Sequence, residues 1–81
     1  MKQLYRIYYS VFDSSKHELV LKTLSERYNA RVVDHPSRVH PDFHFVELYL
    51  DRPGLEEEIQ DLVRTLLGVL HVKVDWIDTT R

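Results

Sequence analysis

The 81-residue chain contains no cysteine, so disulfides, thiolate metal sites, iron–sulfur clusters and cysteine nucleophiles are excluded within it. It has no apolar run near the ~20 residues that a membrane-spanning helix needs. Arg6 and Ser10 interrupt the apolar residues near the N-terminus, so no signal-peptide core is expected there. The formal net charge of −2 argues against whole-surface electrostatic binding to nucleic acid or anionic lipid. These absences predict a cytoplasmic protein that does not insert into a membrane.

Glycine is also scarce, with only Gly54 and Gly68 in the chain. Both stand where a helix is expected to begin or end, so no glycine-rich phosphate loop and no nucleophile elbow can be built from them. The acidic run at residues 56–58 is typical of a solvated helix start rather than of an acid–base pair. We therefore expect no enzyme activity and no cofactor.

The length allows one domain, residues 1–81, with a single core. The hydrophobic fraction of 43% and the charged fraction of 30% are those of an ordinary globular protein. A chain this short buries only about 60–65% of the surface that its unfolded form exposes. Pairing with a second copy would add stability, so a homodimer is the expected state.

Hydrophobic periodicity divides the chain into strands and helices. Apolar and polar residues alternate over four segments, as in half-buried strands. Helical spacing of apolar residues follows Asp13-Ser14-Ser15, where Ser15 and Glu18 have the spacing of a capping box. A second helix is expected between a turn at Pro53, which can sit in its first turn, and Gly68. The expected strands are residues 3–12, 30–34, 43–50 and 69–77, and the first helix is residues 15–28.

This order of elements, strand–helix–strand–strand–helix–strand, predicts an α+β protein with a ferredoxin-like βαββαβ sandwich. Its four-stranded antiparallel sheet has strand order 4-1-3-2. Both helices cover one face of that sheet, and the other face stays open.

The open face is predicted to carry an aromatic patch formed by Tyr8, Phe45 and Tyr49 on the two central strands. A small monomer that exposes such a patch is expected to bury it against a partner. A homodimer interface, a platform for nucleic acid or a small ligand, and simple exposure all remain open at this point. The predicted ligand or interface residues are Arg6, Tyr8, Phe43, Phe45 and Tyr49.

Residues 43–48 look like the aromatic core of an RNA-recognition motif, in which bases stack on strand aromatics. His44 replaces the small residue between the aromatics, and Pro41-Asp42 replaces the leading basic–glycine pair. Single-stranded nucleic acid is therefore an alternative partner that the composition does not favour.

Histidines are concentrated around the connection between the second and third strands. His35, His40 and His44 lie within ten residues, and neutral imidazoles suit zinc, nickel or copper. Asp34 or Asp42 would supply a carboxylate. Solvated loop histidines are the simpler interpretation, and a metal-responsive protein is the alternative function.

The chain resembles the ACT-like group of ferredoxin-like regulatory domains, which includes ACT and NIL modules. The residues that carry this resemblance are Val46-Glu47-Leu48-Tyr49-Leu50, Leu67-Gly68-Val69 and Val72-Lys73-Val74. The ending Val74-Asp75-Trp76 also resembles the ACT-like tail domain of MgtC-type proteins. The resemblance implies that a small effector binds at a dimer interface and that the domain regulates an attached or partner protein. We thus expect a non-catalytic regulatory or oligomerisation module.

Overall fold

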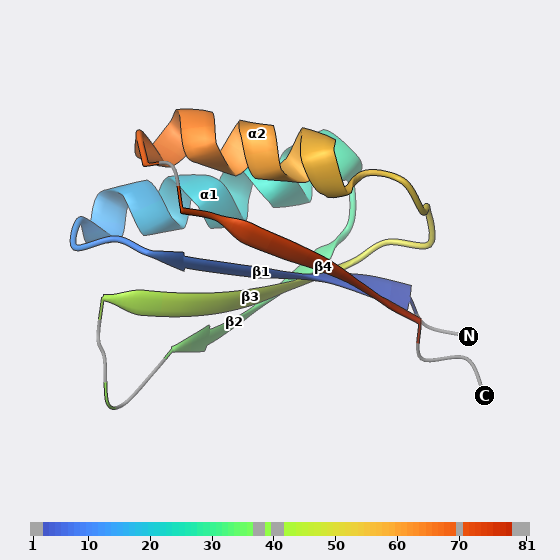
Figure 1. The fold of residues 1–81 in the computed structure, drawn as a ribbon, viewed down its shortest axis with the longest axis horizontal. Coiled ribbons are helices and arrows are strands. Elements are labelled where there is room, and N and C mark those ends of the chain that lie inside the picture. The colour runs from blue at the N-terminus through green and yellow to red at the C-terminus, as the bar shows by residue number, and fades with distance from the viewer. Residues whose placement is uncertain (1–2, 37–38, 40–41, 70, 79–81) are drawn as a thin grey trace.

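The computed structural model describes residues 3–36, 39, 42–69 and 71–78. Two helices lie side by side on one face of a four-stranded sheet (Figure 1). Neither helix within the described part of the chain is long and apolar enough to cross a membrane. The elements in order are β1 (Gln3–Ser10), α1 (Ser14–Tyr28), β2 (Arg31–Pro36), β3 (Phe43–Tyr49), α2 (Glu56–Leu67) and β4 (Lys73–Asp78).

The strands are antiparallel and follow the order β2-β3-β1-β4, which is the predicted order 4-1-3-2 read from the other edge. The two central strands pair Tyr8 with Phe45 and Ile7 with Val46. The prediction of an α+β, ferredoxin-like βαββαβ fold is confirmed.

Helix α1 begins at Ser14, shortly after the end of β1, because Asp13 caps it. The Asp13 carboxylate accepts a hydrogen bond of 2.9 Å from the backbone N–H of Ser15, which would otherwise have no partner inside the helix. The predicted capping box of Ser15 and Glu18 is therefore wrong, since the cap lies two residues earlier. The expected stop at Asn29 is confirmed, because Asn29 adopts the left-handed conformation with φ 48°.

Helix α2 begins at Glu56. The sequence predicted that Pro53 lies in the first turn of this helix, so the helix starts three residues later than expected. Gly54 has φ +83°, so the chain is still turning there. The backbone N–H of Leu55 then donates to the Tyr5 hydroxyl, at 3.1 Å, before the helix starts. Strand β4 also starts later than expected, at Lys73 rather than at residue 69.

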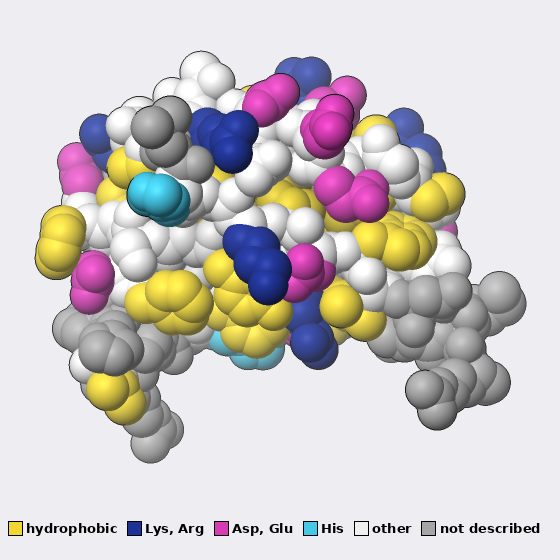
Figure 2. All heavy atoms as spheres, in the orientation of Figure 1, with side chains coloured by type: hydrophobic (Ala, Val, Ile, Leu, Met, Phe, Trp, Pro, Cys, Tyr) yellow, Lys and Arg dark blue, Asp and Glu magenta, His cyan; other side chains and the backbone are white. Residues whose placement is uncertain are grey.

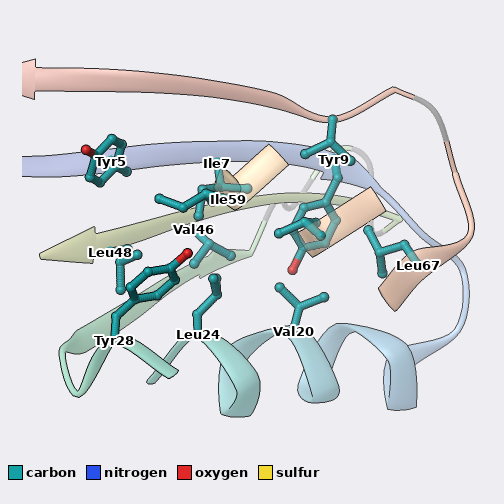
Figure 3. Close-up of a cluster of buried hydrophobic side chains, with 12 residues drawn as sticks. Tyr5, Ile7, Tyr9, Val20, Leu24, Tyr28, Val46, Leu48, Ile59 and Leu67 are labelled. Atoms are coloured by element: carbon teal, nitrogen blue, oxygen red, sulfur yellow. The ribbon is translucent and has the colours of Figure 1, made fainter. Parts of the chain in front are cut away.

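The core lies between the sheet and the two helices (Figure 3). Alternate residues of β1 and β3 point into it, as period-2 spacing requires. Helix α1 presents a stripe at i, i+4 and i+8, and α2 presents one at i, i+4 and i+8 as well. The buried apolar side chains are Tyr5, Ile7 and Tyr9 from β1, Val46 and Leu48 from β3, Val20, Leu24 and Tyr28 from α1, Ile59, Val63 and Leu67 from α2, and Val72.

Candidate functional site

The open face of the sheet forms a grid whose rows run across the strands. One row reads His35, Phe45, Tyr8 and Lys73 from β2 to β4. The next row reads Val33, Glu47, Arg6 and Asp75, and the row after it reads Arg31, Tyr49, Leu4 and Ile77. An aromatic row therefore lies beside a charged row.

The aromatic row is a stack of rings that stand upright on the sheet. The Tyr8 and Phe45 rings have centroids 5.1 Å apart and planes 15° apart, and the His35 ring stacks on Phe45 at 4.9 Å. The ring of Phe43 lies 6.5 Å from that of Tyr8. The separations of 5.1 Å and 4.9 Å are close to the ~4.8 Å between neighbouring strands, so the planes of the His35, Phe45 and Tyr8 rings face one another and their edges face solvent.

Three cations lie over aromatic rings of this face. The Arg6 guanidinium carbon is 5.6 Å from the centre of the Phe45 ring, and the Lys73 ammonium is 5.8 Å from that of Tyr8. Arg31 lies 5.6 Å from the ring of Tyr49. Figure 2 shows hydrophobic side chains exposed along the edge of the sheet, with Lys or Arg side chains among them. The rings are thus covered in part by the chain's own cations.

Glu47 is the most buried charged residue of the open face, with 9% of its surface exposed. Its carboxylate accepts from Arg6 Nε at 3.4 Å and lies 2.8 Å from His35 Nε2. The Tyr49 hydroxyl donates to the same carboxylate at 3.5 Å. One acid therefore joins side chains from β1, β2 and β3.

All five predicted interface residues lie on the open face: Arg6, Tyr8, Phe43, Phe45 and Tyr49. The contiguous patch expected from Tyr8, Phe45 and Tyr49 has a different composition, because Glu47 lies between Phe45 and Tyr49 on β3. The ring that extends the stack is that of His35, from β2. The register of β2 against β3 decides this, and a proline-containing connection leaves that register open in the sequence.

A hollow of about 550 Å³ lies at one end of the sheet, where β1 and β4 meet the end of α2, and it opens onto the open face. Tyr8, Phe43 and Lys73 line it from the open face, and Arg64 of α2 and His71 line it from the other side. A volume in the range of about 300–1,000 Å³ is typical of small-ligand sites.

The helix-covered side holds a second cluster, around His17 of α1. The Tyr9 hydroxyl is 2.7 Å from Nδ1 of His17, and Oδ2 of Asp34 is 3.1 Å from Nε2 of the same ring. The ring of His44 stacks on that of His17, with centroids 3.7 Å apart. One ligand atom each from His17, Asp34 and His44 lies within 4.8 Å of the other two, so these residues could hold a metal ion.

Burial shapes the acid–base properties of this cluster. Desolvation lowers the pKa of His44 below its usual 6.5, and the adjacent His17 lowers it further, while a hydrogen bond with the Val11 backbone opposes this. Burial also raises the pKa of Tyr9, and the Asp34 carboxylate acts in the same direction. His44 is therefore held neutral and Tyr9 keeps its proton at neutral pH.

The two predicted metal ligands that the structure describes, His35 and His44, are not brought together. His35 lies on the open face beside Glu47, whereas His44 lies on the helix side beside His17. The reason is that His35 pairs with Phe45, and His44 is the neighbour of Phe45 along β3, where successive side chains point to opposite faces. His40 lies outside the described residues. Asp34, suggested as a supplementary carboxylate, does lie at the cluster. His17 was missed, although it precedes Val20 and Leu24 at helical spacing on the buried stripe of α1.

Comparisons with protein-family models, with curated proteins and with solved structures find no significant match to this chain. The function is therefore inferred from the geometry of the open face and of the cluster under α1. The open face offers a mixed aromatic and charged surface with a hollow at its edge. The cluster under α1 offers two imidazoles and a carboxylate at metal-ligand spacing.

Proposed function

We propose that this chain is a non-catalytic regulatory or oligomerisation module that pairs with a second copy through the open face of its sheet. The observation that carries the proposal is the upright stack of His35, Phe45 and Tyr8 across three strands. The exposed edges of these stacked rings are apolar. A second flat surface that covers them removes this apolar area from water, which stabilises the association.

The charges of the open face favour a second copy over an unrelated partner. A two-fold interface pairs one surface with itself, so it needs both signs of charge within the same patch. Arg6 and Lys73 supply positive charge, and Glu47 and Asp75 supply negative charge, within two adjacent rows. This arrangement allows complementary pairs across a two-fold axis.

The same features weigh against the alternative of single-stranded nucleic acid. Base stacking needs a free ring face, and the faces of Phe45 and Tyr8 are already opposed to each other. The carboxylates of Glu47 and Asp75 would also lie beneath the phosphates. Binding of mixed oligonucleotides with a steep salt dependence would favour this alternative over the dimer.

A small effector fits the hollow beside the stack. A partner copy lying on the open face would extend over the region between Phe43 and Lys73 and enclose it further. The ammonium of Lys73 and the imidazole of His71 suit a ligand with a carboxylate or another anionic group. Such a ligand would contact both copies and so stabilise the dimer, which is the behaviour that the ACT-like resemblance implies.

Sedimentation equilibrium of the wild type and of Phe45→Ala tests the proposal. We expect a dimer at high micromolar concentration, and we expect Phe45→Ala to weaken association by more than about tenfold, as truncation of a central interface aromatic does. The matched control is Phe12→Ala, since Phe12 is 92% exposed in the β1–α1 connection and away from the sheet face. A wild type that stays monomeric at high micromolar concentration, or equal weakening by both variants, would overturn the proposal.

A further inference from the structure

A group of side chains from three elements converges on the helix side of the sheet, where none of the interface residues lie. His17 comes from α1, Asp34 from β2 and His44 from β3. Figure 3 shows Tyr9 pointing from β1 into the space between the sheet and α1, where its hydroxyl meets His17. Among the described residues, it is the one group of three histidine and acidic side chains whose ligand atoms lie close enough together to hold a metal ion.

We propose that His17, His44 and Asp34 form a binding site for a transition-metal dication of the zinc, nickel or copper class. Two imidazoles and one carboxylate are a donor set that suits these ions, whereas calcium and magnesium prefer oxygen ligands alone. Three protein ligands leave a further position for water or another ligand. The site is independent of the proposed dimer, because its ligands lie on the other side of the sheet.

The distances already approach those of a bound site. Nε2 of His17 and Oδ2 of Asp34 are 3.1 Å apart. Two ligand atoms each bonded at about 2.0–2.1 Å to a tetrahedral zinc lie roughly 3.3–3.4 Å from each other. The ligand atoms of the cluster lie within 4.8 Å of one another, so a contraction together with a tilt of the His44 ring would bring it to the same separation.

His44 has a nitrogen available for such an ion. Its Nδ1 is buried and has no hydrogen-bond partner among the described residues. A buried polar atom left in this state costs free energy, and coordination of a cation is one way to remove that cost. The rings of His44 and His17 stack with 17° between their planes, so one ring must tilt for the in-plane lone pairs of both to point at a common ion.

Tyr9 completes the site as a positioning residue. In the tautomer of His17 that donates Nε2–H to the Asp34 carboxylate, Nδ1 accepts from the Tyr9 hydroxyl. If Nε2 binds a metal, the ring must carry its proton on Nδ1, and Tyr9 becomes the acceptor. Metal-binding histidines commonly donate their other N–H to such a partner, which fixes the ring and its tautomer. The Tyr9 hydroxyl serves both states without moving.

The site can be reached from solvent at two points. A hollow of about 210 Å³ lined by Val11, Phe12, Ser14 and Asp42 reaches His44. A second hollow, of about 380 Å³, reaches Asp34 beside α1. The Asp34 side chain is itself 33% exposed. A hydrated ion therefore has an entry path without opening of the core.

Titration of the tag-free protein with zinc, nickel and copper salts, in competition with a chromophoric chelator, tests the site. We expect one equivalent to bind and to raise the thermal midpoint, because the ligands come together only in the folded state. His44→Gln and Asp34→Asn should each weaken binding by about tenfold or more. The matched control is His35→Gln. It removes a histidine that is close to His44 in sequence but lies on the opposite face of the sheet, so metal binding should be unchanged.

Asp34→Asn keeps the test decisive if His44→Gln fails to fold, since Asp34 is partly exposed and the change is nearly isosteric. Nitrogen-15 NMR of the His17 ring gives a readout that a purely structural role would not move. We expect the proton to shift from Nε2 to Nδ1 on loading, and Tyr9→Phe to weaken binding while retaining the fold. Binding that is absent, that is unchanged in Asp34→Asn, or that is lost in His35→Gln would overturn the proposal.

Discussion

The imidazole rings of His17 and His44 lie nearly parallel, with 3.7 Å between their centroids. They come from α1 and β3, so this stack is a polar contact inside the layer where helix meets sheet. The Tyr9 ring packs against both imidazoles, with its centroid 5.8 Å from that of His17 and 5.5 Å from that of His44. Polar groups in such a layer are retained at a cost in stability unless they are paired or bind something. The contact between the two rings is therefore the part of the helix side that core packing alone does not explain.

The first prediction concerns the assignment of the two sheet faces. Leu48 is fully buried between β3 and α1, so Leu48→Ala should lower the free energy of unfolding by about 2–4 kcal/mol. Phe45→Ala, on the open face, should lower it by less at concentrations where the protein is monomeric. Urea denaturation measures both. The surface control is Leu19→Ala on α1, where Leu19 is 44% exposed and a change within about 0.5 kcal/mol is expected. Equal losses from Leu48→Ala and Phe45→Ala would show that the faces are assigned wrongly.

Local patterns were sufficient to predict the fold and the open face. Alternation in β1 and β3 placed Tyr8 and Phe45 on one side and Ile7 and Val46 on the other, and the register confirms both. The order of elements then limited the topology, because both crossovers must be right-handed. Each of these steps depends on residues within one element or on a general rule of chain connection.

The cluster of His17, Asp34 and His44 could not be predicted in the same way, because its members meet only through tertiary packing. His35 and His44 are close in sequence but separated by the sheet, while His17 and His44 are distant in sequence but stacked. Two local signals together pointed to the second pair. His17 shares the buried stripe of α1 with Val20, and His44 shares the core side of β3 with Val46. These two signals do not give the position of α1 along β3, and that position decides whether the two rings meet.

The second prediction concerns the end of α2. Gly68 has φ +70° and closes the helix through a hydrogen bond from its N–H to the Arg64 carbonyl. Gly68→Ala should lower the free energy of unfolding by about 1–2 kcal/mol, because an L-residue is strained in this conformation. No atom lies within 4 Å of the added Cβ, so steric clash does not contribute. Thermal unfolding measures the loss. Gly68→Asn is the control and should lose less, since asparagine tolerates the left-handed region, as Asn29 does at the end of α1.

The third prediction concerns alkaline pH. The Tyr28 hydroxyl donates to Glu58 at 2.6 Å, and burial together with that carboxylate raises the pKa of Tyr28 from 10.0 to about 12. The folded state therefore holds the proton more tightly than the unfolded state does. The resulting stability is complete below pH 10 and is lost as pH rises through about 12. Urea denaturation at pH 8 and at several values above pH 10 measures this loss. Tyr28→Phe should be less stable than the wild type near pH 8 and should lose stability less steeply above pH 10. An identical slope in both proteins would contradict the assignment.

The last prediction compares two ion pairs on the open face that differ in burial. Arg6 and Glu47 are 3.4 Å apart with the Glu47 side chain 12% exposed, while Lys73 and Asp75 are 3.7 Å apart with side chains 73% and 38% exposed. Double-mutant cycles with Arg6→Gln and Glu47→Gln should give a coupling of about 1 kcal/mol, and cycles with Lys73→Gln and Asp75→Asn about 0.3 kcal/mol.

Salt separates these two pairs further, because ions screen exposed charges more effectively than partly buried ones. The Debye length falls from about 10 Å at 0.1 M to about 3 Å at 1 M ionic strength. The coupling of Lys73 to Asp75 should therefore vanish at 1 M sodium chloride, while that of Arg6 to Glu47 should largely persist, since His35 and Tyr49 also hold the carboxylate in place. These measurements belong at monomeric concentration, where contacts between copies do not contribute. If the Arg6–Glu47 coupling also disappears in salt, Glu47 is solvated in the monomer, and the charged row is a flexible surface rather than a fixed part of the proposed interface.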